Sequence, residues 1–413
     1  MFKPEQYSKI KIFYIFLLAI AWSLYAYNHK TVLGRGVIMS PDSFRYSIWA
    51  DILIKYNFNP FDFVANVDFL WPPYFYYNWI TIAAINKVLL GESWGLGIVV
   101  LNLLAGIFAA LLLLKTTWTL TEKPGCAIFA GLFLLLCHDF FLWVPYVLSD
   151  ILFSLICFSI FILITRLYQQ PAEYLKRVIW ILILICYAMF FRPSWPPLVM
   201  FAILSIPLIF FFSLKTVDPN ERHNFIIRCS LLACIFIPAI IFYHSYFMLH
   251  PDKWPFPFLG STISYLSKDY QQGIVIWARP ETYHSSPSGI LSFALISAHK
   301  MIAFFYISVD SFSFKHALYN YIIFLPLYGL SIFATTRLFI KTDGPSPEKW
   351  WCIFFCVLYI FLFAFFHALQ QIDFDFRYRV PCLLPLVLLA TLGFNELMTR
   401  FFKKTSNRKM HLL

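Results

Sequence analysis

Long apolar runs separated by short polar stretches dominate this chain of 413 residues. An α-helix needs about 20 apolar residues to cross the core of a bilayer, and about ten of the runs approach or reach that length. Their bounds are 12–27, 94–114, 126–144, 151–165, 178–191, 197–214, 229–249, 317–340, 350–368 and 380–398. The pattern predicts an all-α polytopic membrane protein with about ten transmembrane helices.

Two further apolar runs, 72–90 and 290–309, are interrupted by polar residues. We predict that both form helices lying on the outer membrane surface. If either one crossed the membrane once, every later loop rich in Lys and Arg would lie on the outer side. Cytoplasmic loops are instead expected to carry the excess of Lys and Arg.

Basic residues set the predicted orientation. Nineteen of the 32 Lys and Arg residues lie in short segments that become cytoplasmic when the N-terminus is inside. This places both termini in the cytoplasm. The prediction is a single membrane domain over residues 1–398, with a first outer loop at 28–93 and a fourth at 250–316. A short basic tail follows at 399–413.

The composition excludes several classes of protein. Hydrophobic residues make up 60% of the chain and charged residues 13%, against about 45–50% and 25% in soluble domains. The net charge of +11 is accounted for by the basic connections, so no nucleic-acid partner is predicted. The nine cysteines lie within or at the edges of apolar runs, which argues against a disulfide framework.

Two acidic residues stand where predicted outer loops meet helices. Asp42 lies in "SPDSFRYSIWADIL", and Asp150 begins the helical part of "LSDILF". Either could cap a helix, because Ser, Pro and Asp are common at helix N-termini. Alternatively, a carboxylate at the mouth of a membrane cavity could accept a proton from a substrate hydroxyl.

Two of three arginines near predicted outer surfaces, those of the closing motif, are candidates for phosphate binding. Arg192 lies in "FFRPSWPP", and Arg377 and Arg379 lie in "DFDFRYRVPCLLP". A guanidinium binds phosphate through two parallel donors. Arg192 could instead extend to lipid headgroups, and the acids at 373 and 375 could neutralise their neighbours. The histidines are scattered without the spacing of metal ligands, so no metal site is predicted from them.

The order of these motifs resembles the GT-C superfamily of membrane glycosyltransferases. The motifs are "PDxxRY" at 41–46, "LSDILF", "FRP" at 191–193 and the closing "RYRVPCLLPLVLLA". The pattern is most similar to that of bacterial members related to protein O-mannosyltransferases and to lipid A aminoarabinose transferase.

The resemblance implies an inverting transfer of a sugar from a polyprenyl-phosphate donor to an acceptor hydroxyl on the outer face of a bacterial inner membrane. The acceptor would be a lipid, a glycan or a protein. By the same resemblance, the catalytic residues would be Asp42, as the general base, and Asp150, as a second acid. The donor phosphate would be bound by Arg377, Arg379 and Arg192. The substrate cavity would be lined by Arg45, Tyr46, Trp71 and Tyr378.

The sequence differs from this family at one position, and other classes of membrane protein remain alternatives. Some relatives carry a glutamate just before the proline of the segment "LWPPYFYYNW", where this chain has Trp71. The participation of a divalent metal ion is therefore left open. A polytopic transporter or polysaccharide polymerase would also show many spans and cavity charges. Transporters commonly contain repeated halves, which this sequence does not display.

Overall fold

The computed structural model describes residues 37–67, 73–169, 173–213, 290–308, 313–339, 346–369 and 376–410. Nearly all of these residues lie in helices, and their only β-type pairing is an isolated bridge between Ile38 and Tyr146. The predicted all-α class is thus confirmed. The helices are α2 (Pro41–Lys55), α3 (Pro60–Asn66), α4 (Tyr77–Leu90), α5 (Trp94–Thr121), α6 (Pro124–Leu136), α7 (His138–Phe141), α8 (Asp150–Gln169), α9 (Tyr174–Met189), α10 (Pro196–Ser213), α13 (Ile290–Ala303), α14 (Phe314–Thr336), α15 (Pro347–Leu369) and α16 (Val380–Met410). Short 3₁₀ turns precede or follow some of them: η1 (Pro73–Tyr76), η2 (Gly91–Ser93), η6 (Arg337–Phe339) and η7 (Phe376–Arg379).

Five stretches of the described chain are long and apolar enough to cross a membrane. They contain the predicted spans 94–114, 151–165, 317–340 (to Phe339), 350–368 and 380–398. The chain is therefore an integral membrane protein whose described residues are almost entirely helical. Two of the predicted spans, 12–27 and 229–249, lie outside the described residues.

The other predicted spans form shorter helices. The run 126–144 divides into α6 and the single turn α7, because the helix breaks at Cys137 before the polar pair His138 and Asp139. The runs 178–191 and 197–214 become α9 and α10, of 16 and 18 residues. Ten crossings remain a prediction.

The two predicted surface helices are both short. The run 290–309 contains α13, which has 14 residues and at 1.5 Å per residue covers about 21 Å, less than the thickness of a bilayer core. The run 72–90 contains α4, also of 14 residues. Gly91, with a positive φ of 55°, and the turn η2 separate α4 from α5, although both helices fall in one apolar stretch, Tyr77–Thr121.

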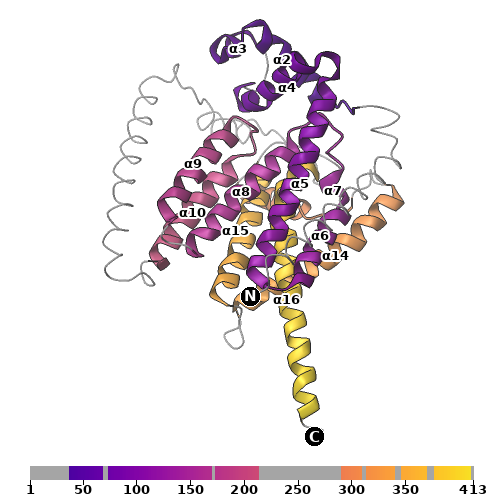
Figure 1. Ribbon diagram of the computed structural model, residues 1–413, viewed down its shortest axis with the longest axis vertical. Helices are drawn as coiled ribbons and strands as arrows, with labels where there is room; N and C mark the ends of the chain where they lie inside the picture. The colour runs from indigo at the N-terminus through magenta and orange to yellow at the C-terminus, as the bar shows by residue number, and fades with distance from the viewer. Residues whose placement is uncertain are drawn as a thin grey trace.

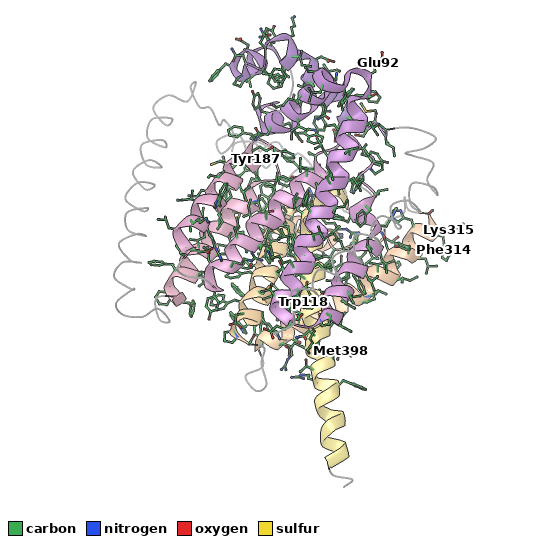
Figure 2. All side chains as sticks on the ribbon, viewed as in Figure 1. Glu92, Trp118, Tyr187, Phe314, Lys315 and Met398 are labelled. Atoms are coloured by element: carbon green, nitrogen blue, oxygen red, sulfur yellow. The ribbon has the colours of Figure 1, made fainter. Side chains whose placement is uncertain are left out.

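The helix α16 lies at the centre of the bundle, where it packs against α5, α6, α8, α14 and α15 (Figure 1). The helices α2, α3 and α4 gather at one end of the bundle, around the start of α5. Figure 2 shows Glu92 at this end and Trp118 and Met398 at the opposite one. The predicted tail at 399–413 is largely a helical continuation of α16 to Met410, which extends beyond the other helices.

Close approach of α14 and α16 depends on one glycine. A Cβ atom at Gly393 of α16 would lie 2.1 Å from the carbonyl oxygen of Leu330 in α14. Small residues allow such backbone contact between membrane helices. Because a backbone atom cannot rotate away as a side chain can, any larger residue at position 393 must push the two helices apart.

We therefore expect Gly393→Ala to destabilise the protein by about 1–3 kcal/mol through overpacking. Thermal unfolding of the detergent-solubilised protein measures this as a lowered Tm. Gly329→Ala is the matched control, because a Cβ there would meet nothing within 4 Å and alanine favours a helix by about 1 kcal/mol over glycine. Equal melting temperatures for the two variants would contradict the close-contact explanation.

Candidate functional site

Backbone hydrogen bonds join the two loops that precede the candidate acids. Ile38 N–H donates to the Pro145 carbonyl (3.1 Å), and Val147 N–H donates to the Ile38 carbonyl (3.2 Å). Asn102 on α5 adds side-chain N–H donors to the carbonyls of Tyr146 and Leu148 (3.0 and 3.2 Å). These bonds hold the starts of α2 and α8 side by side, although they are about 100 residues apart in sequence.

Asp42 stands in the first turn of α2 but does not cap it. The cap is Ser40, whose hydroxyl oxygen accepts from Ser43 N–H (3.2 Å), while the Ser43 hydroxyl oxygen accepts in return from Ser40 N–H (3.0 Å). The Ser43 hydroxyl also donates to the Val147 carbonyl, 3.0 Å away. Asp42 therefore keeps its carboxylate for other partners, and the capping alternative is excluded for this residue.

The partners of Asp42 are two guanidinium groups. Arg377 Nη1 donates to Asp42 Oδ2 at 2.7 Å, and Arg45 Nη1 lies 3.6 Å from Oδ1. Since Arg377 belongs to η7, the pair connects the first described helix to the start of the last one across 335 positions. The Asp42 side chain is 28% exposed, so this end of the site is partly exposed.

Asp150 forms the second ion pair of the site. Its Oδ1 accepts from Nη1 of Arg192, which follows α9. The Asp150 side chain is only 2% exposed, and its Oδ2 has no hydrogen-bond partner among the described residues. The loop bearing Arg192 is fixed to α4, because Asn78 donates from its backbone to the Phe190 carbonyl and from its side chain to the Tyr187 carbonyl, both at 2.8 Å.

Tyr378 connects the two ion pairs. The guanidinium carbons of Arg192 and Arg377 lie 5.7 and 5.9 Å from the centre of its ring, and the His367 ring centre lies 5.1 Å away. The structure thus brings Asp42, Asp150, Arg192, Arg377 and Tyr378 into one cluster. We call these five residues the acid–arginine cluster.

Two tyrosines border the acid–arginine cluster. The ring centres of Tyr46 and Tyr76 are 5.3 Å apart. Burial is the main cause that raises the pKa of both hydroxyls; the Asp42 charge adds to the rise, and Arg192 and Arg377 oppose it. Both phenols therefore stay neutral, able to donate a hydrogen bond but not to act as bases. Tyr46 was expected from the sequence, whereas Tyr76 was missed within the aromatic segment that the sequence singled out.

Arg379 lies in a different cluster from Arg377. Its Nε and Nη2 donate to Oδ2 of Asp139, and its Nη1 donates to the Tyr306 carbonyl. The guanidinium carbon also lies 4.3 Å from the centre of the Phe324 ring. Each of its three nitrogens thus has a partner that does not belong to the acid–arginine cluster.

Asp139 is the acid that sequence reasoning left out of the site. Two nitrogens of Arg379 donate to its Oδ2, and the positive charge of this arginine favours the ionised form of the carboxyl group. The carboxylate is therefore ionised. The signal was visible in the sequence as a polar His–Asp pair interrupting the run 126–144.

The remaining predicted residues differ in how far the structure places them. Arg45 is partly exposed beside Asp42, and its guanidinium carbon lies 6.0 Å from the Trp49 ring centre. Trp71 lies outside the described residues, as do the acids at 373 and 375. Among the described residues, no group of three or more His, Cys, Asp and Glu has the arrangement of a metal site.

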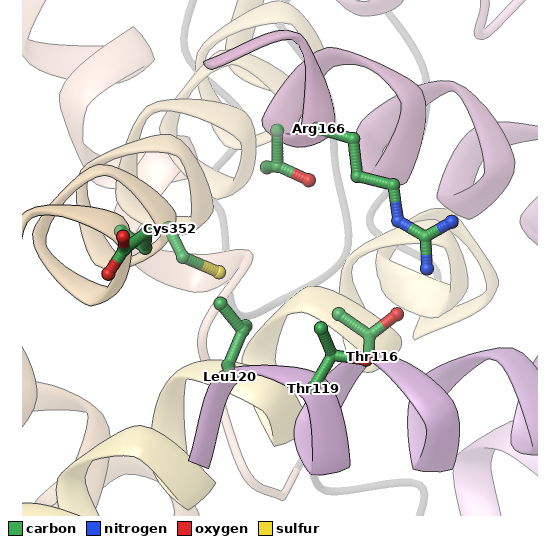
Figure 3. Close-up of a pocket in the computed structure, with 7 residues that line it drawn as sticks. Thr116, Thr119, Leu120, Arg166 and Cys352 are labelled. Carbon is green, nitrogen blue, oxygen red and sulfur yellow. The ribbon is translucent and has the colours of Figure 1, made fainter. Parts of the chain in front are cut away.

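A polar hollow lies at the other end of the bundle, between α5, α8 and α15 (Figure 3). Thr116, Thr119, Thr165, Arg166 and Glu348 line it together with two less polar residues. It belongs to the end marked by Trp118 in Figure 2, opposite the end where α2 lies. The hollow is thus separate from the acid–arginine cluster.

Together the fold and the cluster define a helical integral membrane protein with two acid–arginine pairs near the start of its central helix. Comparison of the chain with protein-family models, with curated protein sequences and with solved structures finds no match. Membership of a glycosyltransferase superfamily therefore stays a prediction from the sequence motifs.

Proposed function

We propose that the chain is a membrane glycosyltransferase that moves a sugar from a polyprenyl-phosphate donor to an acceptor hydroxyl, with inversion at the anomeric carbon. The observation that carries the proposal is the contact between Asp42 and Arg377. It joins a partly exposed carboxylate, suited to accept a proton, to a guanidinium suited to bind phosphate. These are the two kinds of group that such a displacement requires at neighbouring positions.

The first step of the proposed reaction is an exchange of partners at Arg377. Arg377 binds Asp42 at 2.7 Å, and this contact occupies a carboxylate oxygen that the proposed reaction needs for the proton. The donor phosphate competes for the same N–H groups. When it replaces Asp42, the arginine holds the phosphate and the carboxylate becomes available as a base.

The second step is a single displacement. Asp42 takes the proton of the acceptor hydroxyl while that oxygen forms a bond to the anomeric carbon of the sugar. The bond between this carbon and the phosphate oxygen breaks, and its electron pair leaves with the polyprenyl phosphate. Arg377 stabilises the charge that develops on the departing phosphate.

Asp150 and Arg192 form the buried part of the proposed site. Both are buried, and the Tyr378 ring lies near the guanidinium groups of both Arg192 and Arg377. The buried pair would therefore hold Tyr378 in place. Arg192 would also add positive charge near the proposed phosphate position. The predicted cavity residues Arg45, Tyr46 and Tyr378 would contact the sugar or the phosphate.

The proposal also includes the location of the reaction. It puts the acid–arginine cluster on the outer face of a bacterial inner membrane with both chain termini in the cytoplasm. The support is the basic character of the short connections together with the position of α2 at one end of the bundle. Membrane lipids would surround the helices, and the donor's polyprenyl chain would lie among them.

Purified protein in lipid nanodiscs tests the activity. It is incubated with polyprenyl-phosphate sugars and a panel of lipid, glycan and peptide acceptors, and mass spectrometry follows the release of polyprenyl phosphate and the gain of one sugar on an acceptor. Both products are expected in equal amounts. Movement of intact donor across the bilayer of proteoliposomes with no sugar transfer would contradict the proposal and identify a transporter.

A further inference from the structure

The turn η7 holds three consecutive side chains that contact three separate parts of the fold. Arg377 binds Asp42 on α2, Tyr378 lies beside Arg192 and His367, and Arg379 binds Asp139 on α7. A 3₁₀ helix has about three residues per turn, so side chains two positions apart point to different faces. The two arginines consequently serve two different clusters.

The contact between Arg379 and Asp139 is the more enclosed of the two. The Arg379 side chain is 3% exposed and that of Asp139 2%, whereas the side chains of Arg377 and Asp42 are 15% and 28% exposed. Two nitrogens of Arg379 share one carboxylate oxygen, the third binds the Tyr306 carbonyl, and Phe324 covers a face of the guanidinium. The arginine is thereby fixed to α7, to the segment that follows α13 and to α14.

A histidine of α14 lies near the other oxygen of Asp139. This oxygen, Oδ1, lies 3.8 Å from Nε2 of His316 near the start of α14. The His316 ring in turn lies edge-on to the His138 ring, with centres 5.1 Å apart. One carboxylate thus connects α7 and α14 to the turn that precedes the central helix α16.

We propose that Asp139 is a positioning residue for the donor: through Arg379 it holds η7 so that Arg377 stays at the phosphate position when Asp42 releases it. The inference rests on the proposed function, because it needs the exchange of partners at Arg377. During that exchange Arg377 loses its contact with α2. The rest of its turn then keeps the guanidinium in place, and Arg379 is the most enclosed arginine of that turn.

The Asp139→Asn variant tests this role with a change of charge and almost no change of shape. We expect the KM for the donor to rise about tenfold, a change that corresponds to the loss of roughly one charge-assisted hydrogen bond. The kcat should change by less than about threefold, because Asp139 does not touch the reacting atoms. Asp139→Glu, which restores the carboxylate, should recover most of the donor affinity.

A double-mutant cycle separates positioning from general loss of structure. If Asp139 acts through Arg377, then Asp139→Asn should raise the donor KM little further in an Arg377→Gln background. Full additivity of the two effects would overturn the proposal. If Asp139→Asn fails to fold, Arg379→Lys takes its place in the cycle, because it keeps the charge but loses the forked geometry.

Two controls distinguish failure of this inference from failure of the proposed function. Binding of polyprenyl phosphate, measured by native mass spectrometry, should weaken in Asp139→Asn even where no acceptor is present. Suppose that the parent chain transfers sugar, that Asp42→Asn abolishes the transfer, and that Asp139→Asn leaves the donor KM unchanged. This result would overturn the positioning role alone. No transfer by the parent chain would overturn both.

Discussion

Asp42→Asn is expected to lower the rate of sugar transfer by about 10²–10⁴-fold, the usual effect of removing a general base. The asparagine has nearly the same shape but cannot accept the proton of the acceptor hydroxyl. It can still accept a hydrogen bond from Arg377 through its amide oxygen, so the contact across the site is retained in weaker form. Initial rates of acceptor glycosylation, measured with saturating donor, give the effect on kcat.

Asp51→Asn on the same helix is the matched control. Asp51 is mostly exposed, and its carboxylate binds Lys87 on α4 at 2.7 Å rather than Arg377. Its replacement should leave transfer within about twofold of the parent rate, because exposed ion pairs contribute little. If Asp42→Asn and Asp51→Asn both retain the parental rate, Asp42 is not the base.

Arg192→Leu should produce the largest loss of stability among single substitutions in the site. It leaves the Asp150 carboxylate buried without its cation, and one of the two carboxylate oxygens already has no hydrogen-bond partner among the described residues. Breaking a buried pair in this way costs about 3–5 kcal/mol. Denaturant or thermal unfolding in a fixed detergent measures the change in the free energy of unfolding.

The double variant Arg192→Leu with Asp150→Leu provides the control for this prediction. Replacing both members of a buried pair by apolar residues is often neutral or stabilising, so most of the lost stability should return. Transfer activity should stay low in the double variant, since Tyr378 then loses the guanidinium of Arg192 beside it. A double variant less stable than Arg192→Leu would contradict the explanation that a buried carboxylate without its cation causes the loss.

The sequence predicted the helical class and the longer spans because these follow from apolar length alone. It did not predict the break at Cys137, since one His–Asp pair barely lowers the mean hydropathy of a run. In the structure the pair lies directly after the break, and there Asp139 binds Arg379.

The candidate site was predicted in its residue types but not in its pairings. "SPD" offers two capping residues, and only the observed bonds select Ser40 and leave Asp42 to the arginines. Likewise, "RYR" contains two arginines of identical chemistry. Which of them meets Asp42 depends on the 3₁₀ geometry of η7 and on the position of α7, and neither is encoded locally. The two arginine contacts span 335 and 240 positions, and such distances escape reasoning by motif.

The hydrogen bonds between the loops at Ile38 and Val147 use main-chain atoms alone. The pairing itself therefore does not depend on which side chains stand there, although the fully buried Val147 limits the size of side chain that its position admits. The exception is proline, which has no N–H to donate at either position. We therefore expect proline at neither position in a chain that keeps this pairing of the two loops.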